Sequence, residues 1–419
     1  MNFQGLQKVD YQPKSFLEYT KLMPEVVKEI QSVAKDLKGL RVVHLNATAV
    51  GGGVAEILRS EVPLQTDTGL DESWYVIPPN MEFFEVTKKI HNLMQGKPGR
   101  LKTQEKKIYI QYNKFIAQAL SELQPQPQIL IIHDPQPAAL ISFLSEERPD
   151  FVIWRCHIDT SSPNPAMWQF LLPYLKCFDH FIFTLPEYTH KDFPPPNQSS
   201  FFTPVIDPFS AKNILMDKGQ AKEYTKKFGI DIVKPLVTQV SRLDPWKDPL
   251  GVIDAYRLAK KEIPTLQLAL VAQSATDDPE GEVLYTKVRD YIGGEKGIFL
   301  LVNLRNNDKA VNAFQTASSI ILQKSIREGF GLTVTEAMWK GAVVIGGNVG
   351  GIKLQIKDGV NGFVVNSPIE AARKIIYVLN NPQVQEKISQ NAHESVKNKF
   401  LMPHAIINYL NLFKTLLNR

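Results

Sequence analysis

The chain has 419 residues, more than one ordinary hydrophobic core holds, which predicts two domains. Apolar residues make up 43% and charged residues 22%, typical of a soluble globular protein, and no apolar run approaches the roughly 18 residues of a membrane span. The net charge of +5 is too small for a nucleic-acid-binding stripe. Two cysteines, Cys156 and Cys177, form no disulfide framework, and residues 1–16 lack the apolar core of a signal peptide, so we expect a cytoplasmic protein.

Strands and helices alternate along the chain. Short buried strands are predicted at 41–45, 129–133, 151–155 and 180–184, and in the second half at 236–240, 267–271, 299–302, 320–322 and 343–345. Helical patterns are predicted between them at 54–62, 108–123, 250–261 and 308–317. This alternation favours an α/β protein with parallel sheets covered on both faces. A proline- and serine-rich segment, 193–209, separates the two halves, which are predicted to be doubly wound domains facing one another across a cleft.

A glycine run follows the first predicted strand. The segment HLNATAVGGGVAEIL, 44–58, leads from that strand through Gly51, Gly52 and Gly53 into a helix. It has neither the GxGxxG spacing of a dinucleotide site nor the Lys-Ser or Lys-Thr pair of a phosphate-binding loop. Glycines at the start of a helix still allow close backbone approach to a phosphate or a sugar. A tight turn without a ligand is the alternative.

Two further loops of the first half are rich in hydrogen-bonding side chains. The segments IIHDPQP, 131–137, and WRCHIDTSSPN, 154–164, each follow a predicted strand. Together they hold His133, Asp134, Gln136, Arg155, His157 and Asp159. Such a set suits a neutral sugar, whereas no helical histidine pair or cysteine cluster indicates a metal site. A structural histidine remains the alternative for any one of these imidazoles.

Two cations follow the first strand of the second half. In VSRLDPWKD, 240–248, Arg242 and Lys247 lie on either side of a turn that contains proline. A forked guanidinium and an ammonium suit a diphosphate. Two surface cations beside a turn are the alternative interpretation.

The segment EGFGLTVTE, 328–336, is the most informative of the chain. It follows an apolar strand and opens a helix predicted at 333–340, so the glycine turn can aim N–H groups at an anion. Glu328 lies just before the turn, where it can face a reacting centre. Glu336 lies two helical turns further, where it can accept two O–H bonds from a ribose. The pattern therefore fits a sugar nucleotide, and a strand–turn–helix corner with surface glutamates is the alternative.

These motifs resemble those of retaining nucleotide-sugar glycosyltransferases of family 4. The resemblance rests on SRL…K, EGFG…TE, GNVGGI and DGVNGFVV. Further stretches resemble the trehalose glycosyltransferring synthase branch and cover nearly the whole chain: TAVGGGVAEIL (48–58), EFFEVTKKIHN (82–92), HDPQPAAL (133–140), WRCHIDTSSPN (154–164), DPWKDPLGVIDAYR (244–257), DDPEG (277–281) and QKSIREGFGLTVTEAMWKG (323–341).

The resemblance implies a GT-B fold of two Rossmann-like domains. An acceptor-binding domain is expected at 1–203 and a nucleotide-sugar-binding domain at 204–400. The final helix, 401–419, is expected to cross back to the first domain. The apolar spacing of Ile406, Ile407, Leu410, Phe413 and Leu416 is compatible with that docking.

The resemblance also implies a reaction and a set of site residues. The reaction is NDP-glucose (UDP- or ADP-glucose) plus glucose giving α,α-trehalose plus NDP, with the anomeric configuration retained. The catalytic residues would be Glu328, His157, Arg242 and Lys247. The donor would contact Gly52, Gly53, Arg242, Lys247, Glu328, Gly329, Phe330, Gly331, Leu332 and Glu336. The acceptor would contact Asp134, Gln136, Arg155, His157 and Asp159.

Several alternatives stay open at this stage. A trehalose phosphorylase would share the fold and use phosphate in place of NDP. Another family 4 enzyme could use a different acceptor, and a catalytically silent sugar-nucleotide sensor is a third class, which intact Glu328, Arg242 and Lys247 disfavour. No metal and no cofactor is expected, and neither is a nucleic-acid or membrane partner. The base preference, the dominant direction and a homodimeric state are left open.

Overall fold

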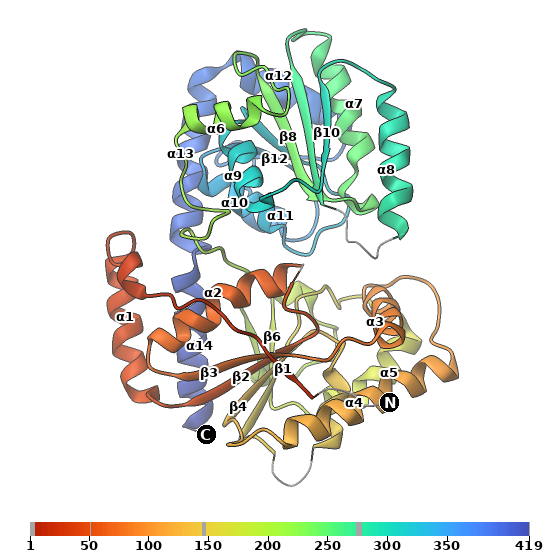
Figure 1. Cartoon of the computed structure of the whole chain (residues 1–419), viewed down its shortest axis with the longest axis vertical. Helices are drawn as coiled ribbons and strands as arrows, with labels where there is room; N and C mark the ends of the chain where they lie inside the picture. Colours follow the sequence, from red (N-terminus) through yellow and green to blue (C-terminus); the bar gives the residue numbers. More distant parts are fainter. Residues whose placement is uncertain (1–4, 51, 145–147, 274–278, 419) are drawn as a thin grey trace. The chain divides into compact units, whose positions relative to one another are not determined.

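The chain divides into two compact units. The computed structural model describes residues 5–50, 52–144, 148–273 and 279–418. Unit 1 comprises Met1–Pro204 with Met402–Arg419, and unit 2 comprises Val205–Leu401 (Figure 1). These boundaries lie one residue from the predicted ones. Gly51 and the two aspartates of DDPEG lie outside the described residues. The cleft between the domains stays a prediction.

Unit 1 is built on a seven-stranded sheet in the order β1-β3-β2-β4-β5-β6-β7. All neighbours are parallel except β1 and β3. The strands are β1 (Gln7–Lys8), β2 (Arg41–Asn46), β3 (Asp71–Val76), β4 (Ile129–His133), β5 (Phe151–Arg155), β6 (His180–Phe183) and β7 (Ser199–Phe201). The order reverses between β2 and β4, which makes the carboxyl ends of these two strands the switch point of the sheet.

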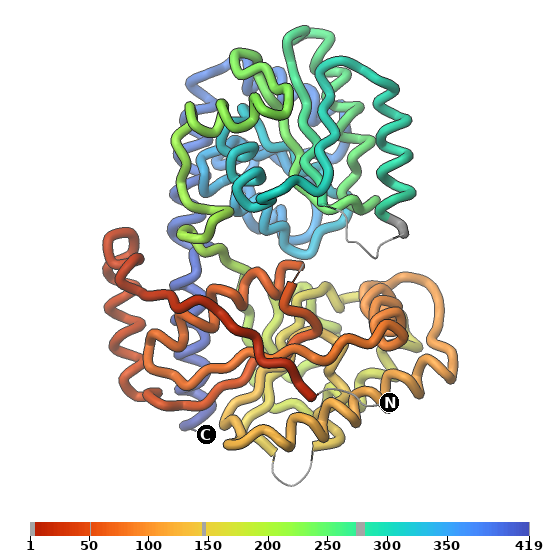
Figure 2. Tube along the Cα trace, in the orientation of Figure 1, coloured from red at the N-terminus to blue at the C-terminus, as the bar shows by residue number. Residues whose placement is uncertain are grey.

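Helices cover both faces of this sheet. They are α1 (Pro24–Ala34), α2 (Gly53–Asp67), α3 (Met81–Met94), α4 (Thr103–Ser121), α5 (Pro165–Leu175) and α14 (Met402–Leu417). On one face, α3, α4 and α5 share the main core with Leu45, Ile132 and Trp154. On the other, α14 packs beside α1 and α2, as the trace in Figure 2 shows, and Lys414 forms an ion pair with Asp36 at 2.6 Å. The last helix therefore belongs to unit 1, as the resemblance implies.

Unit 2 contains a six-stranded, fully parallel sheet in the order β10-β9-β8-β11-β12-β13. The strands are β8 (Leu236–Arg242), β9 (Gln267–Gln273), β10 (Ile298–Val302), β11 (Ile320–Gln323), β12 (Val343–Gly347) and β13 (Phe363–Val365). The helices are α6 (Lys218–Lys226), α7 (Pro249–Lys260), α8 (Pro279–Ile292), α9 (Asn307–Ala317), α10 (Leu332–Trp339), α11 (Ile352–Gln355), α12 (Pro368–Asn380) and α13 (Pro382–Lys399). This is the Rossmann order, with its switch point between β8 and β11.

The predicted strands are all present, whereas the short strands β1, β7 and β13 were not predicted. The helix predicted to stop at Val62 continues through Pro63 to Asp67. Helix α4 begins at Thr103 rather than 108, because the Glu105 carboxylate accepts the backbone N–H of Lys102 at 2.6 Å and caps its first turn. Strand β3, which is six residues long, was also not predicted, since Asp71 and Glu72 interrupt its apolar pattern. Among the described residues, no helix is both long and apolar enough to cross a bilayer.

Candidate functional site

The switch point of unit 2 brings the two main motifs of the second half together. Strand β8 ends at Arg242 and is followed by a short 3₁₀ helix, Pro245–Lys247. Its neighbour β11 ends at Gln323 and leads to Glu328. Ligands of open α/β sheets bind at the carboxyl ends of the strands beside the switch point. The topology therefore supports a ligand site between these two loops.

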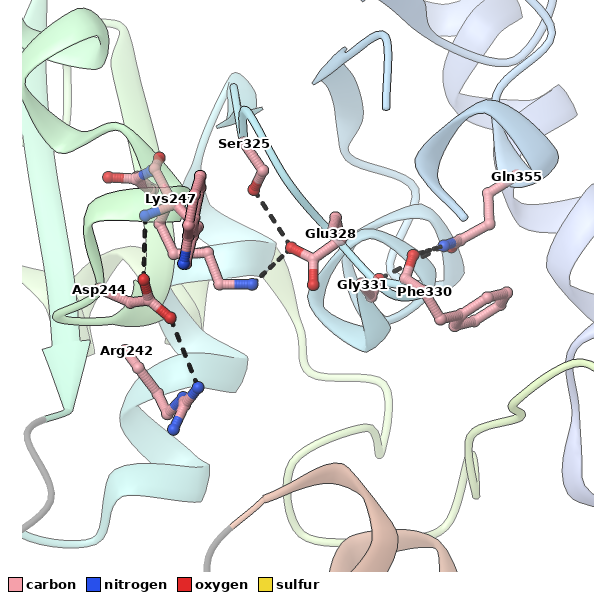
Figure 3. Close-up of polar contacts among 10 residues, drawn as sticks. Arg242, Asp244, Lys247, Ser325, Glu328, Phe330, Gly331 and Gln355 are labelled. Atoms are coloured by element: carbon pink, nitrogen blue, oxygen red, sulfur yellow. Dashed lines mark hydrogen bonds and ion pairs between the residues drawn. The ribbon is translucent and has the colours of Figure 1, made fainter. Parts of the chain in front are cut away.

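Lys247 and Glu328 form an ion pair at this point. Lys247 Nζ lies 2.5 Å from Glu328 Oε2, and the side chains are 17% and 10% exposed. Ser325 Oγ donates to the same carboxylate oxygen at 3.1 Å (Figure 3). The sequence predicted separate roles for the two charged groups and did not predict that they pair. Each charge is compensated by the other where both are largely removed from water.

The glycine turn is held in place by hydrogen bonds to its backbone carbonyls. Gly331 is the N-cap of α10 with φ of 87°, and a Cβ there would lie 3.2 Å from Glu328 Cγ. Glycine is therefore required both by the left-handed backbone and by the packing of the glutamate stem. The Phe330 carbonyl accepts from Gln355 Nε2 at 2.7 Å, and Gly329 O accepts from Gly351 N at 3.0 Å. The turn thus holds Glu328 and Leu332, the first residue of α10, in fixed places.

A second ion pair joins the two loops. Lys324 Nζ donates to Asp248 Oδ2, and the Lys324 side chain is 7% exposed. Asp248 caps α7 from a left-handed conformation, with φ of 50°. Gln239 Nε2 also donates to the Lys247 carbonyl at 2.7 Å. These contacts fix the segment that carries Lys247 against the segment that carries Glu328.

Arg242 and Glu336 differ in exposure from the Lys247–Glu328 pair. The Arg242 side chain is 64% exposed and has a 3.5 Å contact with Asp244, so it is free to reorient towards an anion. Glu336 is buried, at 1% exposure, with Lys212 Nζ 3.5 Å from Oε1 and Gln315 Nε2 3.3 Å from Oε2. If a ribose binds Glu336 as predicted, its hydroxyl groups must share the carboxylate with Lys212 and Gln315.

In unit 1, loops again follow the strands of the switch point. Gly52 is the N-cap of α2, with φ of 82°, and Gly53 is its first residue. Glycine is required at Gly52 by this backbone angle, and a helix N-terminus follows it. The geometry leaves room, since a Cβ built on Gly52 would have no neighbour within 4 Å.

Asp134 and His157 are held together at the ends of β4 and β5. Asp134 has a φ of 60°, and its Oδ1 accepts the backbone N–H of His157 at 2.8 Å. Burial raises the pKa of Asp134 to about 6. His157 Nε2 lies 3.0 Å from His133 Nδ1. Asp134 therefore positions the His157 backbone, in addition to any contact with an acceptor.

The remaining acceptor candidates separate into two kinds. Gln136 Oε1 is buried without a partner among the described residues, and Asp159 Oδ1 accepts from Ser161 N at 2.9 Å. Arg155 is different: it is 3% exposed, and its guanidinium donates to the carbonyls of Phe183 and Phe202 at 3.0 and 2.6 Å. Two of its N–H groups are thus held by backbone inside unit 1, and its contact with an acceptor stays a prediction.

The sequence missed several residues that support the site. Ser325 and Lys324 lie in a motif that was recognised, but nothing in the pattern indicated their partners. His44 and Glu72 lie within strands, where an isolated polar residue is usually taken for the solvent side. Among the described residues, no group of three or more His, Cys, Asp and Glu side chains could hold a metal ion.

The two Rossmann-like units and the charged site at the switch point of unit 2 define a glycosyltransferase of the GT-B class. Residues 220–395 match the family described as glycosyl transferases group 1, and residues 44–190 match the trehalose synthase N-terminal domain. The chain is 45% identical, over 94% of both chains, to a trehalose synthase of Pyrococcus horikoshii. The chain belongs to the trehalose synthase family.

More distant similarities extend this comparison. The chain is 27% identical to a trehalose phosphorylase of Pleurotus pulmonarius, covering 78% of this chain and 50% of that protein. A crystal structure of an α,α-trehalose-phosphate synthase (UDP-forming) from Burkholderia vietnamiensis superposes with a TM-score of 0.70 at 14% identity, covering 90% of this chain and 97% of that one. The latter similarity establishes the fold alone.

Proposed function

We propose that the protein transfers glucose from an NDP-glucose, UDP- or ADP-glucose, to glucose, forming α,α-trehalose with retention of configuration and releasing NDP in the cytoplasm. The observation that carries the proposal is the Lys247–Glu328 pair at the switch point of unit 2, in a chain of the trehalose synthase family. A cation for the diphosphate and a carboxylate for the sugar are the two groups that this chemistry needs side by side.

The proposed roles follow from position and exposure. Exposed Arg242 and part-buried Lys247 bind the diphosphate and stabilise the charge that builds on the leaving group. Glu328 binds the glucose, with the turn at Gly331 holding it in place. The nearby helix N-terminus of α10 adds a positive partial charge. The family resemblance, rather than the geometry, assigns His157 to the donor sugar and Asp134 and Gln136 to the acceptor.

The reaction balances without a further group. The bond from the anomeric carbon to the diphosphate oxygen breaks, the acceptor hydroxyl oxygen bonds to the same face of that carbon, and its proton passes to the leaving oxygen. A double displacement would need a carboxylate on the opposite face. No residue of the chain is assigned to that role, so we propose front-face attack assisted by the leaving group.

The phosphorylase reaction is the second candidate, since a phosphorylase shares part of the sequence. The purified protein should be incubated with UDP-, ADP- and GDP-glucose and a panel of monosaccharides, and the disaccharides separated by chromatography. Trehalose from NDP-glucose and glucose, with equimolar NDP, supports the proposal. Trehalose cleavage that requires inorganic phosphate and is indifferent to NDP would replace it with the phosphorylase reaction. Products with another acceptor would redefine the acceptor specificity.

A further inference from the structure

Glu336 is a carboxylate buried in the second turn of α10, and its side chain is 1% exposed. Burial of a carboxylate is costly unless opposite charge and hydrogen bonds compensate it. The compensating groups come from outside the EGFGLTVTE segment. Lys212 lies in the segment before α6, and Gln315 lies in α9, the helix beside α10 in unit 2 (Figure 1).

These two residues contact the two oxygens of the Glu336 carboxylate. Lys212 Nζ lies 3.5 Å from Oε1, and Gln315 Nε2 donates to Oε2 at 3.3 Å. Gln315 is fully buried, and the same Nε2 also donates to the Thr333 carbonyl at 3.3 Å. Both hydrogens of its amide nitrogen are therefore used, one on the backbone of α10 and one on the carboxylate.

A lysine fixes the direction of this amide. The side chain of a glutamine has a donor end and an acceptor end, which exchange places when the amide turns over. Lys340 Nζ lies 2.9 Å from Gln315 Oε1, and an ammonium can only donate, so the acceptor end must face it. The same ammonium donates to Asn213 Oδ1 at 3.0 Å and to the Glu336 carbonyl at 3.2 Å. The donor end of Gln315 therefore faces the Glu336 carboxylate.

The segment that carries Lys212 and Asn213 is itself tied to the same two helices. Trp339 Nε1, from α10, donates to the Asn213 carbonyl at 3.0 Å. Asn312 Nδ2, from α9, donates to the Ile214 carbonyl at 2.8 Å. All of these contacts lie within unit 2 and exist without a ligand. The Glu336 carboxylate is therefore held in one place in the free protein.

A side chain that is already held loses little freedom when a ligand binds to it. Ordering one long, flexible side chain on binding weakens affinity by roughly 2- to 12-fold. Glutamate is such a side chain, because it rotates about three bonds. A contact that fixes Glu336 in advance should therefore strengthen the binding of any group that the carboxylate accepts from.

We propose that Gln315, oriented by Lys340, is a positioning residue that holds the Glu336 carboxylate for the two ribose hydroxyls of the donor nucleotide. The ribose contact rests on the proposed function, in which the donor is an NDP-glucose. Gln315 and Lys340 themselves contact neither the sugar nor the diphosphate. Their loss should weaken recognition of the hydroxyls and leave the other contacts of the nucleotide in place.

The test compares nucleotides that differ only in those two hydroxyls. UDP and ADP are titrated by calorimetry beside 2′,3′-dideoxy-UDP and 2′,3′-dideoxy-ADP, and the base that binds more tightly to the wild-type protein is used throughout. Because hydrogen bonds to a charged acceptor are strong, the wild-type protein should prefer the ribonucleotide by roughly tenfold or more. Gln315→Met should lower this preference by roughly 2- to 12-fold and bind the dideoxynucleotide like the wild type.

Two further variants test the direction of the amide. Gln315→Glu keeps an acceptor for Lys340 but replaces the N–H that faces Glu336 by an oxygen, so it should lose at least as much of the preference as Gln315→Met. Lys340→Met lets the amide turn over and should lose less. With NDP-glucose, all three variants should raise the donor KM more than they lower kcat, because the ribose contact is made equally in ground and transition states.

The matched control is Gln267→Met. Gln267 is a buried glutamine of the same unit whose amide is also bonded at both ends, to the backbone of Asp231 at 2.9 Å in each direction. It begins β9, at the end of the sheet opposite the loops of the candidate site, so this variant should keep the wild-type preference.

Three results would overturn the proposal. One is an unchanged preference in both Gln315→Met and Gln315→Glu. Another is an equal weakening of both nucleotides by these variants, or loss of the preference in Gln267→Met as well, either of which would make the contact merely structural. If the wild-type protein binds both nucleotides equally, the ribose contact of Glu336 fails and this proposal with it, whereas trehalose formation still decides the proposed reaction.

Discussion

Replacing Glu328 by glutamine should separate binding of the nucleotide from catalysis. In the free protein, the Lys247 ammonium is 2.5 Å from the Glu328 carboxylate. A diphosphate that binds Lys247 must approach this carboxylate. Glu328→Gln keeps the volume and removes the negative charge. It should therefore strengthen binding of NDP alone, while kcat falls because the carboxylate no longer stabilises positive character at the reacting carbon.

The size of the effect follows from the geometry. A phosphate oxygen about 2.8 Å from Lys247 Nζ would lie within about 5 Å of the carboxylate. Two unit charges about 5 Å apart repel by roughly 1–3 kcal/mol at an effective dielectric constant between about 80 and 20. This range corresponds to NDP binding about 5-fold to about 150-fold tighter, and the low exposure of the two side chains, 17% and 10%, favours its upper half. Loss of electrostatic stabilisation should lower kcat roughly 100-fold.

Calorimetry with UDP and ADP, and steady-state kinetics with the matching NDP-glucose, measure both quantities. Lys247→Met is the matched control, since it removes the other half of the pair: NDP binding should weaken, and more so at low salt. Weaker NDP binding by Glu328→Gln, together with an unchanged kcat, would refute the assignment of the two roles. So would unchanged NDP affinity in Lys247→Met.

Four further outcomes are expected. Glu336→Ala should raise the donor KM more than it lowers kcat, because a ribose contact is made equally in ground and transition states, and steady-state kinetics would contradict this if kcat alone fell. Lys324→Met should lower the urea-unfolding free energy by about 3 kcal/mol, since it leaves Asp248 without its partner in a largely buried pair; a loss below about 0.5 kcal/mol would show that the pair is not structural. Glu61 has a folded pKa of about 7 against an ordinary 4.5, so wild-type stability should fall as pH rises through this window, by up to about 3 kcal/mol. Urea unfolding of Glu61→Gln should show a flatter pH dependence over the same range, and equal slopes would contradict the shift. Turnover should survive metal stripping in excess EDTA, and a loss restored only by a divalent ion would mean that the site was misread.

The sequence was most informative where a residue's local surroundings decide its structure. Buried parallel strands such as Ile129–His133 are continuous apolar runs, and their positions could be predicted to within a residue or two. The glycine turn at Gly331 could be predicted as well, because a left-handed backbone and a close side-chain approach both demand glycine. These features depend on a few neighbours along the chain.

Features that depend on residues far apart in sequence could not be predicted. Strand β3 was missed because Glu72 is a carboxylate inside a strand, and its partners His44 and Glu61 come from β2 and α2. Nothing in the sequence indicated that the Arg155 guanidinium donates to the Phe183 and Phe202 carbonyls. The pairing of Lys247 with Glu328 joins residues 81 positions apart. A motif locates such side chains on loops, but only the fold decides which charges meet.

The two units hold the polar side chains of their candidate sites in different charge states. Unit 2 keeps its charges and compensates them, since Lys247 with Glu328 and Lys324 with Asp248 are ion pairs even without a ligand. A diphosphate that binds Lys247 leaves the Glu328 carboxylate without its cation, which favours departure of the anionic NDP. Unit 1 removes charge instead, because burial keeps His44, His133 and His157 neutral. Neutral imidazoles suit hydroxyl groups, so the electrostatics of each unit match the part of a nucleotide sugar or acceptor that we propose it binds.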